Sequence, residues 1–180
     1  MNNLSDRKWK EFIVEDLFCN ISNSKAYHKT NLCETKRGIA YISRTNLNNG
    51  FEAIVSNNSF KSNPKNSIVF GAENASFFYE PFEYITGNKM YVISDERINK
   101  YNGLFIQKML NKSVENCGFG YGKGLIGTRV KKRSICLPVD DSGEPDWQFM
   151  TDYMKSKEQK LIKRYETYLS KINVGGGGGK

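Results

Sequence analysis

Short apolar runs separated by polar turns dominate residues 1–140. The runs are rich in β-branched and aromatic residues, which is typical of strands. The Asn49-Gly50 pair that follows the first of them predicts a hairpin or tight turn. The three clearest predicted strands are residues 39–43, 67–70 and 89–93.

Helical spacing appears at two places in the same part of the chain. Asn99 can cap a helix whose apolar face includes Leu104, Phe105 and Met109. A second, short helix is expected over residues 14–18. Strands and helices together predict a mixed α/β domain.

The pattern changes after residues 140–145, which are polar, contain Gly and Pro, and therefore mark a boundary. Asp146 can cap a helix, and no Gly or Pro interrupts residues 146–174. Apart from one polar interruption at Glu158, apolar residues recur there at alternating spacings of three and four, as in a coiled-coil seam. The seam consists of Trp147, Met150, Met154, Leu161, Tyr165, Tyr168 and Ile172.

A helix of this length would be roughly 40 Å long. It is too long to bury the seam against a small domain along its whole length, so a partner helix is expected; the alternative is a terminal helix that folds back onto the domain. We therefore predict an α/β (α+β) fold with a mixed-sheet domain (1–140), one long coiled-coil-like helix (141–174) and a flexible Gly-rich tail (175–180).

Positive charge is concentrated in two segments of this 180-residue chain, whose formal net charge is +8. One segment covers residues 17–51 and the other residues 121–133, which contain no acidic residue. Such concentrated charge favours a surface that binds nucleic acid, and the alternative is ordinary solubility charge.

Cysteine spacing and the single histidine, His28, argue against a zinc site, because no pair has the CxxC spacing. We expect neither a signal peptide nor a membrane-spanning segment. The four thiols are expected to be reduced and buried in a cytoplasmic protein.

Catalytic patterns are hard to find, and we expect no catalytic residue, no metal and no cofactor. His28, the single histidine, lies in a polar stretch, and a Ser/His/Asp or Cys/His arrangement could be assembled only around it. Residues 122–127 fit a bare G-x-G-x-x-G pattern, but residues 128–138 look β-like, whereas a dinucleotide site needs a following helix. A flexible loop that approaches DNA closely is the better interpretation of this glycine-rich stretch.

Several motifs, in order, resemble one known family. They are Arg7-Lys8-Trp9-Lys10-Glu11-Phe12, then Ala40-Tyr41-Ile42-Ser43-Arg44-Thr45-Asn46-Leu47, then Gly87-Asn88-Lys89-Met90-Tyr91, then Gly120-Tyr121-Gly122-Lys123-Gly124, and finally Pro145-Asp146-Trp147 at the start of the long helix. The chain is similar, over nearly all of residues 7–172, to the specificity subunits of type I restriction-modification systems and to related type IIB-like subunits. Single motifs are loose, but the ordered set is fairly specific.

The resemblance implies a non-catalytic subunit that recognises one half of a bipartite double-stranded DNA site. It also implies a methyltransferase partner and, in type I systems, a translocating nuclease subunit. A full specificity subunit carries two recognition domains and two helices, whereas this chain has one of each. It is therefore a natural half-subunit, a truncated gene product or an excised piece. Two antiparallel seams would form a homodimer that recognises a palindromic bipartite site.

Base contacts are expected from the loop after the first strand, because it combines the side-chain types that bind guanine and adenine. The alternative is an Asn-rich turn held by local hydrogen bonds. The expected DNA-binding residues are Lys25, Lys36, Arg37, Arg44, Thr45, Asn46, Asn48, Tyr121, Lys123, Arg129, Lys131 and Lys132.

Three other functional classes remain open from the sequence. A stand-alone DNA- or RNA-binding regulator would use the same basic segments without a methyltransferase. A small nucleic-acid enzyme would need a metal or cofactor, and a pure interaction protein would not bind DNA.

Overall fold

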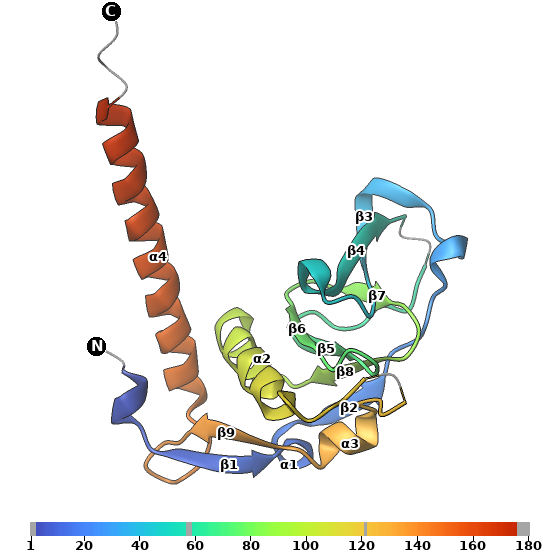
Figure 1. Ribbon diagram of the computed structural model, residues 1–180, viewed down its shortest axis with the longest axis horizontal. Coiled ribbons are helices and arrows are strands. Elements are labelled where there is room, and N and C mark those ends of the chain that lie inside the picture. The colour runs from blue at the N-terminus through green and yellow to red at the C-terminus, as the bar shows by residue number, and fades with distance from the viewer. Residues whose placement is uncertain (1–2, 57–58, 121, 176–180) are drawn as a thin grey trace, which may run out of the picture.

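The computed structural model describes residues 3–56, 59–120 and 122–175 and is shown in Figure 1. Three sheets and two long helices organise the chain, as expected for a mixed α/β fold. The strands are β1 (Trp9–Ile13), β2 (Asn20–Asn23), β3 (Glu34–Ile42), β4 (Phe51–Val55), β5 (Ser67–Gly71), β6 (Phe77–Glu80), β7 (Tyr84–Thr86), β8 (Met90–Ser94) and β9 (Ser134–Pro138). The helices are α1 (Val14–Leu17), α2 (Lys100–Val114), α3 (Gly127–Lys131) and α4 (Trp147–Gly175), with 3-10 turns at Leu4–Asp6, Lys29–Asn31 and Leu47–Gly50.

The central sheet has the order β2-β8-β5-β6 and is antiparallel throughout. A second sheet, β4-β3-β7, pairs β3 antiparallel with β4 and parallel with β7, and a small ribbon joins β1 to β9. The three strands that the sequence predicts all form, as β3, β5 and β8, and the predicted short helix forms as α1.

Helix α2 starts where the sequence predicts, because the Asn99 side chain accepts hydrogen bonds from the backbone N–H groups of Tyr101 and Asn102. Two of its side chains protect the edge of β6. The Gln107 amide oxygen accepts from the Tyr79 N–H at 3.0 Å, and Asn111 bonds both backbone groups of Phe77. The helix therefore replaces a neighbouring strand at an edge that would otherwise have unpaired backbone groups.

Helix α3 corrects one expectation, because residues 128–138 were expected to be β-like throughout. Residues 134–138 do form β9, but Gly127–Lys131 forms a single helical turn. Val130 is fully buried in the main core, and helix α1 packs against this turn. Burial of Val130 outweighs the weak local preference of a β-branched residue for a strand. The short turn does not restore a dinucleotide site, because no strand directly precedes it within the described residues.

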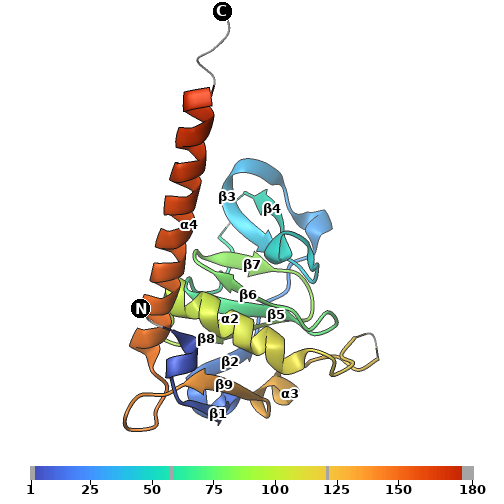
Figure 2. The ribbon, with the colours of Figure 1, turned by 60° about the vertical axis from the view of Figure 1, so that its left-hand side comes forward.

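Helix α4 leaves the domain, as Figures 1 and 2 both show. Asp146 caps it, with its carboxylate accepting from the Phe149 N–H at 2.8 Å. We call residues 159–175 of α4 the arm and the rest of the described chain the head. None of the helices in the described part of the chain is both long and apolar enough to cross a membrane.

The first turns of α4 belong to the core of the head. Met150 is completely buried, and Trp147 and Met154 pack against the same core. Met150 is therefore not available as an intermolecular contact, and Trp147 and Met154 bury part of their surface within the chain. This corrects the predicted seam at its N-terminal end. The physical reason is that α2 lies beside this part of α4 and covers it.

The polar interruption at Glu158 also has an intramolecular partner. Its two carboxylate oxygens accept hydrogen bonds from the Lys100 ammonium at 2.5 Å and from the Tyr101 hydroxyl at 2.9 Å. These two bonds lower the pKa of Glu158 below its ordinary value. Glu158 thus joins the N-terminus of α2 to α4 at the point where the arm leaves the head.

Two of the four thiols are not buried, contrary to the expectation. Cys19 and Cys33 are exposed, whereas Cys117 and Cys136 are partly buried, and all four are free. Cys33 precedes the frayed start of β3, and Cys19 lies just outside the central sheet, so neither position faces the core.

Glu80, at the end of β6, is the basis of a pH-dependent prediction. Burial raises its pKa to about 7. Because the folded state favours the protonated acid, folding loses stability as pH rises from the ordinary Glu pKa of about 4.3 to about 7. Glu80→Gln should therefore raise the free energy of unfolding by about 2 kcal/mol near pH 8, allowing for partial solvent screening, and change it little near pH 4. Urea unfolding at the two pH values measures this, and an equal effect at both would contradict it.

Candidate nucleic-acid interface

The loop of residues 43–50 reverses the chain from β3 into the antiparallel strand β4, so the predicted hairpin is confirmed. Asn48 and Asn49 adopt positive φ angles of 49° and 56°, and the Ser43 N–H donates to the Gly50 carbonyl at 2.9 Å. Asn tolerates this left-handed conformation better than most residues. Gly50 follows with a φ of 81°, so the left-handed residues include both members of the Asn49-Gly50 pair and Asn48 before them.

A neighbouring turn between β5 and β6 holds this loop in place. The Asn74 side-chain amide donates to the Arg44 carbonyl at 2.9 Å and to the Asn46 side-chain oxygen at 2.8 Å. The Thr45 hydroxyl accepts from the Leu47 N–H at 3.1 Å. The local hydrogen bonds of the Asn-rich alternative are thus present, while contact of this loop with bases stays a prediction. Asn46 and Asn48 remain exposed.

Arg44 forms an ion pair with Glu73, whose second carboxylate oxygen accepts from the Lys89 ammonium at 2.6 Å. The hydrogen bond from Lys89 is the main cause of the lowered pKa of Glu73, and the positive charge of Arg44 lowers this pKa further. Only one guanidinium nitrogen of Arg44 is engaged with Glu73. Because Arg has five N–H donors, the remaining ones can still bind a second acceptor.

The glycine-rich segment lies against the same turn. The Leu125 N–H donates to the Ala72 carbonyl at 2.6 Å, which places residues 122–125 next to Glu73 and Asn74. Lys123 donates to the Cys117 carbonyl at 3.1 Å. Tyr121, which the sequence predicts to contact DNA, lies outside the described residues.

A groove of about 410 Å³ beside this segment collects three of the predicted phosphate contacts. The Arg129 guanidinium donates to the Gly124 carbonyl at 2.5 Å, which orients it along the groove. Such a cluster of cations, of which Lys123 and Arg129 are held by backbone carbonyls, suits phosphate oxygens. The groove is lined by Phe119, Lys123, Thr128, Arg129, Lys132 and Arg133.

Two further predicted residues lie close to this region. Lys131 lines an adjoining pocket with Asn23 and Tyr91. Lys25 follows Ser24, whose N–H donates to the Met90 carbonyl at 3.0 Å, so Lys25 lies near the start of β8. These residues, the loop of residues 44–48 and the groove adjoin one another through the turn after β5 and the start of β8, and we call them the basic side of the head.

Lys36 and Arg37 lie apart from this side, so the structure does not bring them together with the other predicted contacts. They lie near the start of β3, whereas Arg44 follows its end. Glu34 and Ile39 both pair with Val55, so Lys36 and Arg37 lie in a bulge of β3, whereas Ile42 at its other end pairs with Phe51. The same basic segment of sequence is therefore divided between the two ends of a strand.

Lys89, Glu73 and Asn74 were not among the predicted site residues. Lys89 lies beside Glu73, and Asn74 supports the loop of residues 44–48 from a distance of about 30 positions along the chain. A polar turn that directly follows the fully buried strand β5 was the available signal, since binding residues often lie on loops at strand ends.

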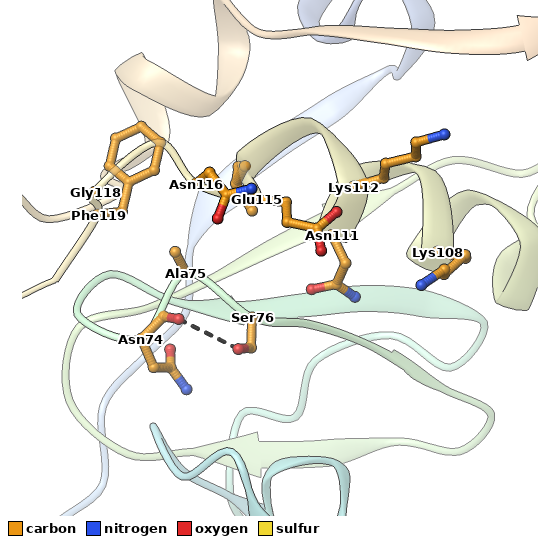
Figure 3. A pocket seen from close by; sticks show the side chains of 11 residues that line it. Asn74, Ala75, Ser76, Lys108, Asn111, Lys112, Glu115, Asn116, Gly118 and Phe119 are labelled. Atoms are coloured by element: carbon orange, nitrogen blue, oxygen red, sulfur yellow. Dashed lines mark hydrogen bonds between the residues drawn. The ribbon is translucent and has the colours of Figure 1, made fainter.

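Figure 3 shows a polar pocket of about 320 Å³ between this turn and the C-terminal part of α2. Lys108 and Lys112 lie on its helical side, while Asn111 is already bonded to Phe77. The Ser76 hydroxyl in its lining donates to the Asn74 carbonyl at 3.2 Å, and no hydrogen bond among the described residues joins it to a lysine or to Glu115. No group of His, Cys, Asp and Glu side chains within residues 3–56, 59–120 and 122–175 could hold a metal ion.

Past Glu158, the predicted seam faces solvent. Leu161 and Tyr165 expose 68% and 62% of their surface, and Tyr168 and Ile172 are similarly exposed. Ile162 and Leu169 widen this apolar strip. An exposed apolar strip of this length is typical of an interaction surface.

Comparison with known proteins identifies a family model and a relative that match most of the chain. The family model described as the type I restriction modification DNA specificity domain matches residues 6–166. The curated protein "Type II restriction enzyme BgcI specificity subunit S.BcgI" from Heyndrickxia coagulans is 28% identical over 169 residues, which cover 92% of this chain and 48% of that protein.

Solved structures share the fold at low identity. The S subunit of a type I restriction-modification system from M. genitalium has a TM-score of 0.59 at 12% identity, covering 95% of this chain and 44% of that one. The HsdS subunit from Thermoanaerobacter tengcongensis has a TM-score of 0.53 at 10% identity, covering 86% and 38%. The chain spans about half the length of the relatives that it matches.

Proposed function

The chain belongs to the type I restriction-modification DNA specificity family, and we propose that it recognises one half of a bipartite DNA site for a modification methyltransferase. The observation that carries this proposal is the family match, which includes both the head and part of the arm. The basic side of the head, with the braced loop of residues 44–48, supports it, because phosphate contacts would position the duplex against that loop.

In this proposal the chain contributes recognition and no catalysis. The methyl transfer belongs to the methyltransferase subunit, and a translocating nuclease subunit can join the same assembly. The chain needs no cofactor or metal of its own for this role. It would act in the cytoplasm, where the DNA is.

A second copy of the chain is the proposed occupant of the apolar strip on the arm. The relatives that the chain matches are about twice as long, so one copy supplies about half of the length of a full subunit. Two arms packed antiparallel would bury Leu161, Tyr165, Tyr168 and Ile172 from each copy and place the two heads at opposite ends. The resulting complex would recognise a palindromic bipartite site.

Methylation mapping tests this function directly. The chain is co-expressed with the modification methyltransferase encoded in the same genome, and methylated bases are located by single-molecule sequencing. The expected result is a bipartite motif with two inverted identical halves that disappears when the chain is omitted. A motif that does not depend on the chain would refute the proposed function, whereas a bipartite motif with two unrelated halves would refute only the homodimer.

A further inference from the structure

The arm is basic as well as apolar. Residues 159–172 of the arm contain four basic residues and one acidic residue, Glu166. Four cations line one shallow groove along α4, together with Thr167 and Tyr168: Lys160, Lys163, Arg164 and Lys171. Three of them, Lys160, Arg164 and Lys171, form what we call the basic strip. None of the three takes part in an ion pair within the described residues, and the side chains along this stretch are exposed.

Helical geometry separates these cations from the apolar strip. Successive residues of an α-helix are offset by about 100°, so Lys160, Arg164 and Lys171 project within about 40° of one another. The centre of this basic strip lies about 120° around the helix from the centre of the whole apolar strip, with Ile162 and Leu169 included. Packing of the apolar strip against a second arm would therefore leave the basic strip uncovered.

Twofold symmetry determines where the two basic strips of a dimer would lie. The axis that relates two antiparallel helices is perpendicular to both helices and to the line that joins them. Rotation about this axis exchanges the helices but keeps each on the same side of their common plane. Both basic strips therefore face the same side of the pair and present six cations there.

We propose that this basic face of the paired arms lies against the duplex between the two half-sites and binds its phosphates. The inference rests on the proposed function and its homodimer. Duplex DNA is the polyanion that such an assembly would hold in line with the arms, with one phosphate charge per about 1.7 Å of axis. Lysine and arginine contacts to phosphate carry no sequence information, which suits a segment between two recognised half-sites.

The salt dependence of DNA binding tests whether the basic strips contact phosphates. The complex of the full chain with its methyltransferase is titrated with a duplex that carries the mapped site, at several salt concentrations. Lys160→Gln/Arg164→Gln removes four cations per dimer and should reduce the slope of log affinity against log salt by about 3 to 4. The matched control is Lys61→Gln/Lys65→Gln, which removes the same charge from exposed positions between β4 and β5 and should leave the slope unchanged.

A second experiment uses a duplex with neutral methylphosphonates placed only between the half-sites. They should weaken binding by the wild-type complex and have little further effect on the arm variant. A wild-type slope for the arm variant, with an intact dimer by light scattering, would overturn the proposal. Loss of the methyltransferase from the arm variant without a change in slope would also overturn it, because the strip would then face a protein. Failure of the proposed function would instead appear in the wild-type complex, as absence of site-specific binding.

Discussion

Leu161→Glu/Tyr165→Glu is expected to convert the chain into a monomer with a folded head. Both side chains are exposed in the single chain, so the head loses no packing. In the proposed dimer each substitution occurs twice, which places four carboxylates in an apolar interface and removes four large side chains from it. At about 1.5–3 kcal/mol for each lost side chain, before any cost of burying charge, the dissociation constant should rise more than 1,000-fold.

Light scattering of the purified chain measures this effect, and circular dichroism reports whether the head is folded. Gln159→Glu/Ser170→Glu is a matched control with the same change in charge, because these exposed positions project from the side of α4 opposite the apolar strip. The control should remain a dimer. An unchanged mass for the Leu161/Tyr165 variant would show that the chain associates through another surface.

Arg44→Ala is expected to lower affinity for the specific site by about 100-fold, since a bidentate contact between arginine and guanine contributes about 1–3 kcal/mol of discrimination. Affinity for unrelated DNA should change by less than about threefold, because one phosphate-type contact contributes little at physiological salt. The bonds from Asn74 and the ion pair with Glu73 hold Arg44 before DNA arrives. A held side chain loses less conformational freedom on binding.

Titration with specific and scrambled duplexes at one salt concentration separates the possible roles of Arg44. Arg37→Ala is the matched control, because Arg37 lies at the other end of β3, and it should leave both affinities nearly unchanged. An equal loss on both duplexes would assign Arg44 to the phosphate backbone. No loss of affinity for either duplex would show that Arg44 does not take part in DNA recognition.

Local sequence determined most of the elements. Asn99 and Asp146 predict the starts of α2 and α4, because a cap needs only a side chain three residues before the N–H that it accepts from. The hairpin after β3 was similarly predictable from its Asn-rich turn. The period of the apolar residues after Asp146 predicted the length of α4, and the ordered motifs indicated the family, which the comparison confirms.

Tertiary structure decided which of these residues contact distant segments of the chain and which face solvent. Met150 is core and Leu161 is exposed although both occupy the same strip, because α2 ends its contact near Glu158. Lys36 and Arg44 belong to one basic segment of sequence but to opposite ends of β3, and the acid that holds Arg44 comes from the turn after β5. The spacing of residues along the chain specifies caps, turns and periodicity. It does not specify these pairings, because they depend on the order of strands in the sheets and on where one helix ends beside another.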